Sequence, residues 1–282
     1  YMHENQAAYP ISETVDPRTI DRDMHLSFTN LSSIEAADKV LWNSKYNRDS
    51  FIEKMQLIMR RAPESIDNSW IERLEAKSCI AWPPVEPVDG DGAVLHNRKT
   101  GRYQDGPDAE RKIVRVAWPH RWEHDKGCDE FLQLIEKTRN DPVLEFRWTI
   151  LGQRYERMPA SMHVILSDHA DCLDHAGLVE DRNGYLSLLG SCDWVASTSR
   201  HEFFGIAVVE ALLMGCLPWL PQRLSYPELL PLEFQGVDPW HPPEDEQRAR
   251  RDIASHLHGA LAPVSVQRIE GELEESVEDW LA

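Results

Sequence analysis

The sequence has little lysine. Only 8 of its 282 residues are lysine, against 22 arginine and 48 acidic residues, so the formal net charge at pH 7 is −18. Broad, sequence-independent binding to nucleic acid depends on basic surface. The composition therefore argues against such binding, although it is compatible with a local basic patch.

Cysteine and long apolar runs are also scarce. The five cysteines are scattered and form no C-x-x-C pair, so neither a disulfide framework nor a structural zinc site is indicated. We therefore expect a reducing, cytoplasmic compartment. No apolar run approaches the roughly 20 residues of a membrane-spanning helix, and we expect no membrane partner.

The motifs of several common active sites are missing. There is no Walker A loop, no G-x-G-x-x-G and no G-x-S-x-G, which argues against the usual nucleotide-binding loops and against α/β-hydrolases. His120 and His124 have the spacing of a zinc pair, but Pro119 and a loop-like context argue against it. The stretch 168–175 is rich in Asp, His and Cys, yet it straddles a predicted helix end and strand start, so its side chains should diverge. We expect no bound metal.

The sequence pattern changes near residue 111, which suggests a domain boundary. The stretch before it is rich in Gly, Pro, Asp and Arg and is typical of a linker or mobile loop. We predict four parts: a partial N-terminal domain over 1–85, the linker over 86–111, a second domain over 112–243 and a helical tail over 244–282.

The N-terminal part contains helical patterns. Ser32 and Ser33 are suited to cap a helix, so we expect the first helix to open at one of them. Short strands are predicted at the extreme N-terminus and at 78–85.

Strands and helices alternate in the second domain. Apolar runs predict strands at 112–118, 145–151, 172–177, 193–197 and 216–220. Helices are predicted between them, at 128–139, 159–169, 183–192 and 205–214. The composition of 159–169 also suits a strand, but Pro159 favours a first helical turn. This alternation argues for an α/β fold, with a parallel sheet covered by helices on both faces.

Two glutamates stand out after the strand at 193–197. Ligands bind beyond the carboxyl ends of parallel strands, and Gly205 opens a helix whose N-terminal N–H groups suit a phosphate. Glu202 precedes this helix and Glu210 lies inside it, where both are good acceptors for sugar hydroxyls. Alternatively, Glu210 pairs with a nearby arginine and Glu202 is solvated. The arrangement of loop, glycine and helix favours the sugar.

A second strand–loop–helix element carries cations. Arg121 and Lys126 follow the strand at 112–118, and two cations at a strand end suit a diphosphate. The alternative is ordinary surface charge. Because both loops would point into one crevice, we favour the diphosphate.

These residues resemble a known family. The string EFFGIAVVE resembles the E-x7-E signature of the retaining glycosyltransferases of family 4, which have the GT-B fold of two Rossmann-like domains. Arg121 and Lys126 match that family's Arg and Lys, five positions apart. The strings VAWPHRWEHDKG, RHEFFG, YMHENQAAYP and WNSKYNRDSF resemble one branch, the queuosine-tRNA mannosyltransferases.

The resemblance implies an enzyme, a hexosyltransferase. It would move mannose, with retention of configuration, from GDP-mannose to queuosine at the wobble position of aspartate tRNA. The implied partners are a nucleotide sugar and queuosine-containing tRNA, with no cofactor, no metal and no protein partner.

The resemblance also assigns roles to residues. The catalytic candidates are His3, facing the donor sugar, and Glu202, contacting the hexose. Arg121, Lys126 and Gly205 would hold the diphosphate, whose charge develops as the glycosidic bond breaks. Further candidates are Phe203, Phe204, Glu210 and Glu228 for the donor sugar and ribose, Leu178 and Val179 for the base, and Asn5, Asn43 and Ser44 for the acceptor.

Members of this family carry a further strand–helix segment before the H-E-N string. The resemblance therefore implies that the N-terminal Rossmann-like domain is incomplete in this sequence. Two alternative functions follow from weaker readings of the same residues. One is another family 4 hexosyltransferase that acts on a lipid or polysaccharide, and the other is a nucleotide-sugar-binding module without catalysis.

Overall fold

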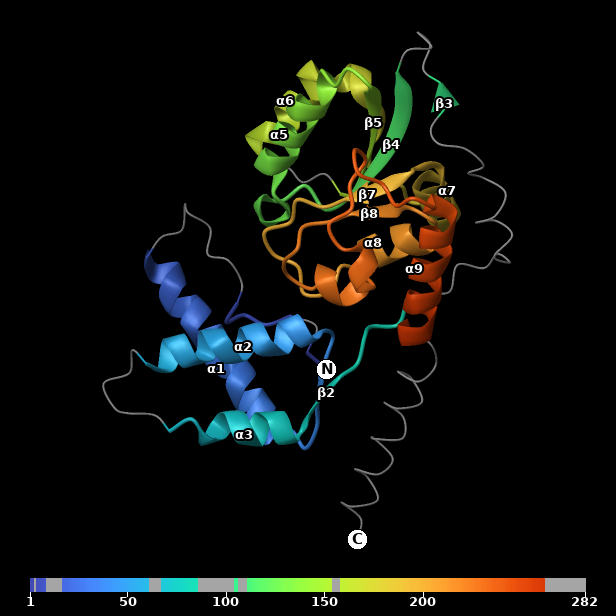
Figure 1. The fold of residues 1–282 in the computed structure, drawn as a ribbon. Coiled ribbons are helices and arrows are strands. Elements are labelled where there is room, and N and C mark those ends of the chain that lie inside the picture. The colour runs from blue at the N-terminus through green and yellow to red at the C-terminus, as the bar shows by residue number, and fades with distance from the viewer. Residues whose placement is uncertain are drawn as a thin grey trace. The chain divides into compact units, whose positions relative to one another are not determined.

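The chain folds into two units. The structure, a computed structural model, describes residues 1–2, 4–8, 17–60, 67–85, 104–105, 111–153 and 158–261, with only the backbone for 17–24 and 104–105. Unit 1 contains Tyr1–Pro84 together with His201–Phe204 and, of the described residues, 259–261, and unit 2 contains Val85–Arg200 and Gly205–His258. Each unit has its own sheet, and Figure 1 shows the larger one, that of unit 2.

Unit 1 is mostly helical around a two-stranded sheet. Its elements are α1 (Pro17–Ala36), β1 (Val40–Trp42), α2 (Lys45–Met59), α3 (Ser69–Ala76) and β2 (Ser78–Ile80). The strands β1 and β2 run parallel, and Met2 adds a parallel bridge to Trp42. The core of unit 1 is formed by Ile34, Val40, Trp42, Phe51, Met55, Met59, Trp70 and Leu74.

The first helix differs from the expectation. Ser32 and Ser33 do not open a helix: they lie near the end of α1, where their hydroxyls donate to the carbonyls of Phe28 and Thr29, four residues earlier. Serine can bond back to the preceding turn in this way as well as cap a helix. The cap in this region is Ser44, whose side chain accepts from the Asn47 N–H at the start of α2.

Unit 2 is built on a parallel sheet with the order β6-β5-β4-β7-β8. Its strands are β4 (Lys112–Pro119), β5 (Leu144–Leu151), β6 (Leu173–Gly177), β7 (Trp194–Ala196) and β8 (Leu217–Trp219). The short β3 (Gln104–Asp105) pairs antiparallel with the start of β4. The predicted α/β class with parallel sheets is confirmed, and the strands lie where the apolar runs placed them.

Helices connect the parallel strands, as right-handed crossovers require. They are α5 (Cys128–Arg139), α6 (Ala160–Asp168), α7 (Arg182–Ser191) and α8 (Ile206–Leu213), followed by α9 (Glu246–Leu261). Short 3-10 turns are η1 (His124–Lys126), η2 (Ala170–Cys172), η3 (Tyr226–Leu229) and η4 (Leu232–Phe234). Figure 1 shows α5 beside α6 on one side of the sheet, and α7 near α8 on the other.

Aromatic side chains fill the space between the sheet and its helices. Trp118, Trp148 and Trp194 on three central strands are fully buried. The ring of Trp118 stacks on Phe131 of α5, with 4.5 Å between centroids. Strands buried on both faces are expected in a parallel sheet with helices on each side, which explains why their sequences are apolar runs rather than alternating patterns.

Some of the predicted segments lie outside the described residues. The linker 86–111 does so except for 104–105 and Arg111, and the tail does so beyond Leu261. The described part of the tail is the helix α9, in agreement with its helical pattern.

Candidate functional site

The strand order places a switch point between β4 and β7. These two strands are neighbours in the sheet, but the connection after β4 leads toward β5 and the one after β7 leads toward β8. In open parallel sheets of this kind, ligands bind outside the carboxyl ends of the strands at such a point. The loops that follow β4 and β7 are those that hold the candidate diphosphate-binding residues.

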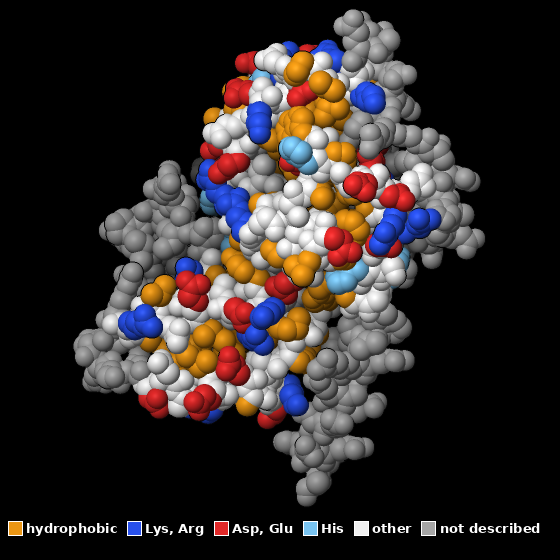
Figure 2. Space-filling view, viewed as in Figure 1, with side chains coloured by type: hydrophobic (Ala, Val, Ile, Leu, Met, Phe, Trp, Pro, Cys, Tyr) orange, Lys and Arg blue, Asp and Glu red, His pale blue; other side chains and the backbone are white. Residues whose placement is uncertain are grey.

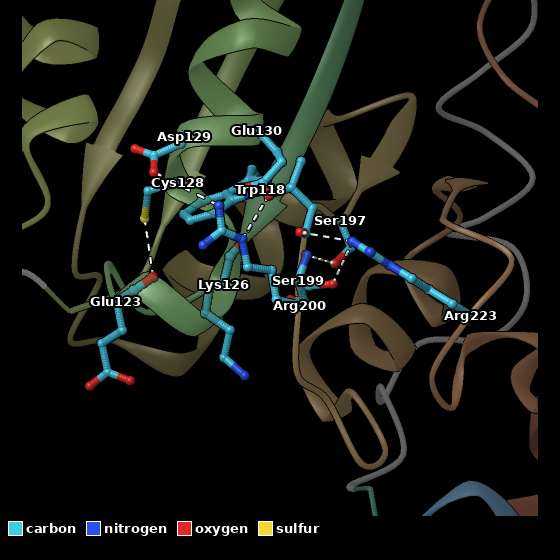
Figure 3. A network of polar contacts seen from close by, with 11 residues as sticks. Trp118, Glu123, Lys126, Cys128, Asp129, Glu130, Ser197, Ser199, Arg200 and Arg223 are labelled. Atoms are coloured by element: carbon cyan, nitrogen blue, oxygen red, sulfur yellow. Dashed lines mark hydrogen bonds and ion pairs between the residues drawn. The ribbon is translucent and has the colours of Figure 1, made fainter. Parts of the chain in front are cut away.

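The loop after β4 holds two cations beside two acids. The Arg121 guanidinium lies 3.4 Å from the Glu123 carboxylate, and its side chain is half exposed. The Lys126 ammonium lies 3.1 Å from Asp125, and both side chains are buried. Because a buried charge is costly without a partner, the Asp125 carboxylate stabilises the Lys126 cation at the sheet edge. Figure 3 shows the Lys126 side chain extending away from α5.

Hydrogen bonds join this loop to the loop after β7. Thr198 donates from its hydroxyl to the Lys126 carbonyl at 2.9 Å, and accepts from the Trp118 indole at 3.0 Å. The Arg200 N–H donates to the Asp125 carbonyl at 2.8 Å. The backbone of Asp125 and Lys126 is therefore fixed by hydrogen bonds from the loop after β7.

Glycine is required where the two loops touch. Gly127 has φ of 68°, and a Cβ atom there would overlap the carbonyl oxygen of Thr198. Gly152, after β5, has φ of 136°, and a Cβ atom there would overlap the carbonyl oxygen of His120. Both positions need the left-handed backbone and the small volume of glycine. Sequence reasoning missed Gly127, although its place directly after Lys126 and before a helix was a signal.

Arg223 anchors the loop after β7 from the other side. Its guanidinium donates to the Ser199 carbonyl at 3.0 Å and to the Thr198 carbonyl at 3.4 Å (Figure 3). The Ser197 hydroxyl lies 2.6 Å from the Tyr226 hydroxyl. Arg223 and Tyr226 come from the segment after β8, so three loops are joined at this edge.

Several buried polar atoms at this edge have no hydrogen-bond partner among the described residues. They are His120 Nε2, Asp125 Oδ1 and Ser199 Oγ. Burial, and then the nearby Lys126 cation, lower the pKa of His120 from 6.5 to about 3, so its imidazole is neutral. Buried polar groups in native proteins are nearly always bonded, so these three atoms are candidates for hydrogen bonds to a polar ligand.

Glu210 is bound from α7. The Arg182 guanidinium lies 2.7 Å from Glu210 Oε1, and the Tyr185 hydroxyl donates to Glu210 Oε2 at 2.9 Å. The sequence alternative, an arginine partner for Glu210, is thus present in the structure. The predicted contact with ribose stays a prediction, because a carboxylate can accept more than two hydrogen bonds. The sequence alternative did not identify which arginine pairs with Glu210, and it did not include Tyr185.

Gly205 and the residues before it fall in different units. Gly205 belongs to unit 2, where it is the N-cap residue of α8 and has φ of 93°. Glu202 is half-buried, and Phe203 and Phe204 are buried, in unit 1. In unit 1 the ring of Phe204 packs against that of Trp82, with 5.3 Å between centroids. The rings of Phe203 and Tyr46 are 6.3 Å apart by the same measure.

The remaining donor candidates lie in segments that follow other strands of unit 2. Leu178 and Val179 come directly after β6, and Leu178 is 58% exposed. Glu228 is half-buried in η3 after β8. An exposed leucine at the carboxyl edge is compatible with stacking against a base, and both assignments stay predictions.

The acceptor candidates of unit 1 form a buried network around Asn47. The Asn5 amide donates to Asn47 Oδ1 at 2.7 Å, and Asn43 Oδ1 accepts from the Asn47 amide at 2.7 Å. The Ser44 hydroxyl accepts a hydrogen bond from the Asn47 backbone N–H. Since Asn5, Asn43 and Ser44 are buried, their contacts hold the N-terminal segment onto α2. His3 lies outside the described residues.

Opposite charges are mixed on the described surface. Arg139 pairs with Asp171 at 2.7 Å and Arg147 with Asp174 at 2.8 Å, and these two acids come from the stretch 168–175. Among the described residues, no group of three or more metal-ligating side chains is suitably placed for a metal ion. Figure 2 shows acidic and basic side chains interspersed, with a group of Lys and Arg along one edge.

The helices described by the structure include none that is long and apolar enough to cross a membrane.

Solved structures show which known fold this chain resembles. The structure of Anabaena HepE in complex with UDP and glucose has a TM-score of 0.58 and 16% sequence identity, covering 97% of this chain and 70% of that one. At this identity the likeness concerns the fold, which is the GT-B fold of glycosyltransferases.

Sequence comparisons identify relatives of this chain. Residues 1–85 match the sequence model of the tRNA-queuosine alpha-mannosyltransferase N-terminal domain. The chain is 34% identical over 241 residues to the tRNA-queuosine alpha-mannosyltransferase of Drosophila melanogaster, covering 83% of this chain and 59% of that protein. The chain has the GT-B fold and is related in sequence to tRNA-queuosine alpha-mannosyltransferase.

A second relative is also an alpha-mannosyltransferase by its name. The GDP-mannose:cellobiosyl-diphosphopolyprenol alpha-mannosyltransferase of Xanthomonas campestris is 25% identical over 183 residues, covering 60% of this chain and 48% of that protein. The chain thus spans between about half and three fifths of the length of these two relatives.

Proposed function

We propose that this chain transfers mannose from GDP-mannose to queuosine at the wobble position of aspartate tRNA, with retention of configuration. The observation that carries the proposal is the 34% identity to the Drosophila enzyme over 83% of the chain. In the reaction, the bond from mannose C1 to the diphosphate breaks and a bond from C1 to a hydroxyl of queuosine forms. GDP leaves, and the hydroxyl proton is released.

Both relatives support the mannosyl donor. Each is an alpha-mannosyltransferase by its name, and one name specifies GDP-mannose. Their acceptors differ, since one is a tRNA nucleoside and the other a lipid diphosphate. The higher identity and the match of residues 1–85 favour queuosine tRNA.

The edge of the unit 2 sheet provides chemistry for the leaving group. The negative charge of a departing diphosphate is stabilised by preorganised cations and N–H groups in a site that excludes water. Lys126 is a buried cation held by two loops, Arg121 is a half-exposed cation in the same loop, and Gly205 begins a helix whose N-terminus suits phosphate. Glu202 and His3 are proposed to act on the donor sugar.

The test is transfer of labelled mannose from GDP-mannose to tRNA. Queuosine-containing tRNA is compared with the same tRNA lacking queuosine, using this chain and, in parallel, the product of the full gene. We expect label only on the queuosine tRNA. Label on a polyprenol-linked acceptor instead would support the second candidate, a lipid-directed mannosyltransferase. GDP-mannose binding without transfer by either protein would support a binding module.

A further inference from the structure

A cluster on two helices of unit 2 fixes one carboxylate from both sides. Arg182 and Tyr185 lie in the first turn of α7, and Glu210 lies in α8. Each helix follows a parallel strand, so its first turns lie at the carboxyl edge of the sheet. The Glu210 side chain is 11% exposed and that of Arg182 is 40% exposed, which places the ion pair between the interior and the solvent.

Packing of α8 does not require an acid at position 210. Its neighbours in the helix, including Val209 and Ala211, are fully buried apolar residues. Replacing a buried ion pair by apolar side chains of similar volume is often neutral or stabilising. A structural role alone therefore explains this acid poorly, whereas a ligand that needs a fixed hydrogen-bond acceptor explains it well.

The geometry leaves half of the acceptor capacity of Glu210 for a ligand. An ionised carboxylate has about four lone-pair sites. Within the described residues, Arg182 occupies a site on Oε1 and Tyr185 a site on Oε2. One site then remains on each oxygen, and a cis-diol presents two hydroxyl donors at a matching spacing.

Tyr185 can act toward Glu210 only as a donor. Burial, together with the neighbouring Glu210 carboxylate, raises the pKa of Tyr185, so the phenol stays protonated at neutral pH. The Arg182 guanidinium also lies over the Tyr185 ring, 5.5 Å from its centroid. The three side chains therefore restrict one another and orient the carboxylate.

We propose that Arg182 and Tyr185 are positioning residues that hold Glu210 to accept hydrogen bonds from the two ribose hydroxyls of the donor nucleotide. The inference rests on the proposed function, since it concerns the nucleotide-sugar site. In this proposal, Arg182 and Tyr185 make the nucleotide site prefer a ribonucleotide over its deoxy analogues.

The test compares GDP with 2′,3′-dideoxy-GDP by isothermal titration calorimetry. We expect the chain to bind GDP roughly ten- to a hundredfold more tightly, the range for hydrogen bonds to a charged group. Tyr185→Phe and Arg182→Lys should each reduce this ratio and leave the affinity for the dideoxy nucleotide unchanged. Glu210→Gln should also reduce the ratio of the two affinities. In the double variant Glu210→Gln/Tyr185→Phe, the ratio should be about the same as in Glu210→Gln alone.

The matched control is Arg139→Lys, which alters an arginine–carboxylate pair of the same 2.7 Å length at the surface. It should leave both affinities unchanged. Thermal unfolding of each variant checks that the fold persists. A merely structural role for Arg182 and Tyr185 predicts equal losses for GDP and the dideoxy nucleotide, and that result would overturn the inference.

Other outcomes separate the inference from the proposed function. Equal binding of GDP and dideoxy-GDP by the unaltered chain overturns the inference but leaves GDP as the donor nucleotide. If UDP binds instead of GDP, the proposed donor is wrong. The inference then stands if dideoxy-UDP binds more weakly and Tyr185→Phe removes the difference, and it is overturned if the difference persists. Binding of neither GDP nor UDP overturns both.

Discussion

The Asn47 network of unit 1 and the sheet edge of unit 2 both bury polar side chains, but they do so in different ways. In unit 1, neutral amides and a hydroxyl surround Asn47, and the Asn5 amide alone makes bonds to Asn47 and Ser50. In unit 2, charged residues meet at the sheet edge, and His120, Asp125 and Ser199 each have a buried atom without a hydrogen-bond partner among the described residues.

This difference suggests that one cluster serves mainly stability and the other mainly ligand binding. A satisfied buried network fixes one conformation and offers little to a ligand. A buried edge with unsatisfied donors and acceptors reduces stability, and a polar ligand can compensate for that. Polar side chains are therefore expected to control folding in unit 1 and donor binding in unit 2. Three predictions test this comparison.

The largest effect is expected from Lys126→Met. The substitution removes the buried cation and keeps an apolar stem, so kcat/KM for the proposed mannosyl transfer should fall by roughly 10²–10³-fold, as for other groups that stabilise developing charge. Initial rates at several GDP-mannose concentrations measure the loss.

The matched control for Lys126→Met also changes Asp125 to Asn. The single variant leaves Asp125 as an uncompensated buried charge, which costs about 3 kcal/mol. The double variant should recover stability in urea unfolding without recovering transfer. If transfer returns with stability, Lys126 acts on the fold rather than on the diphosphate.

The second prediction concerns unit 1. Asn47→Ala removes the partner of Asn5 and Asn43 and leaves their amide groups buried, so it should reduce the free energy of unfolding by about 2–3 kcal/mol. The affinity for GDP should not change. Urea unfolding and calorimetry measure the two quantities.

Asn68→Ala is the control for Asn47→Ala, because Asn68 is an exposed residue before α3 whose side chain makes no capping hydrogen bond. It should change stability by less than about 0.5 kcal/mol. A loss of GDP affinity in Asn47→Ala comparable to that in Lys126→Met would contradict the division between the two units.

The smallest effect is expected from the pH dependence of His120. Its pKa is about 3 in the folded chain, below the ordinary value of 6.5. The neutral form thus favours folding: its contribution is fully present above pH 6.5 and is lost as the pH falls toward 3. Between pH 7 and pH 5 the expected loss is about 2 kcal/mol.

His120→Gln should remove this part of the acid destabilisation, and His163→Gln, at an exposed histidine of α6, should not. Urea unfolding at pH 7 and pH 5 gives the comparison. An unchanged pH dependence in His120→Gln would show that the imidazole is protonated or solvated in the folded chain.

The fold was largely predictable, because local patterns carry it. The helix expected at 128–139 is α5, Cys128–Arg139, and the strand expected at 112–118 is β4. Glycines such as Gly205 and Gly215 mark the ends of α8, and both have positive φ. The error at Ser32 and Ser33 arose where a hydroxyl has two uses, since serine both caps helices and bonds back within them.

The sequence predicted which residues lie at the candidate site, but not which side chains contact one another there. The place of Arg121, Lys126 and Gly205 after strands followed from the chain, because the carboxyl ends of parallel strands share one edge of the sheet. The partners of Glu210 did not follow, since Tyr185 lies 25 positions away and the pairing depends on how α7 packs beside α8. The buried network of Asn5 likewise joins residues 42 positions apart.

The sequence by itself determined the alternation of strands and helices, the order of the loops and the family strings. These features depend on local propensity, apolar spacing and residue identity, which are properties of short segments. The tertiary structure decided which charges are buried together, that Gly127 must be small because Thr198 lies against it, and that Glu210 is held by Arg182 and Tyr185. Those contacts depend on distances between separate elements, and only packing sets such distances.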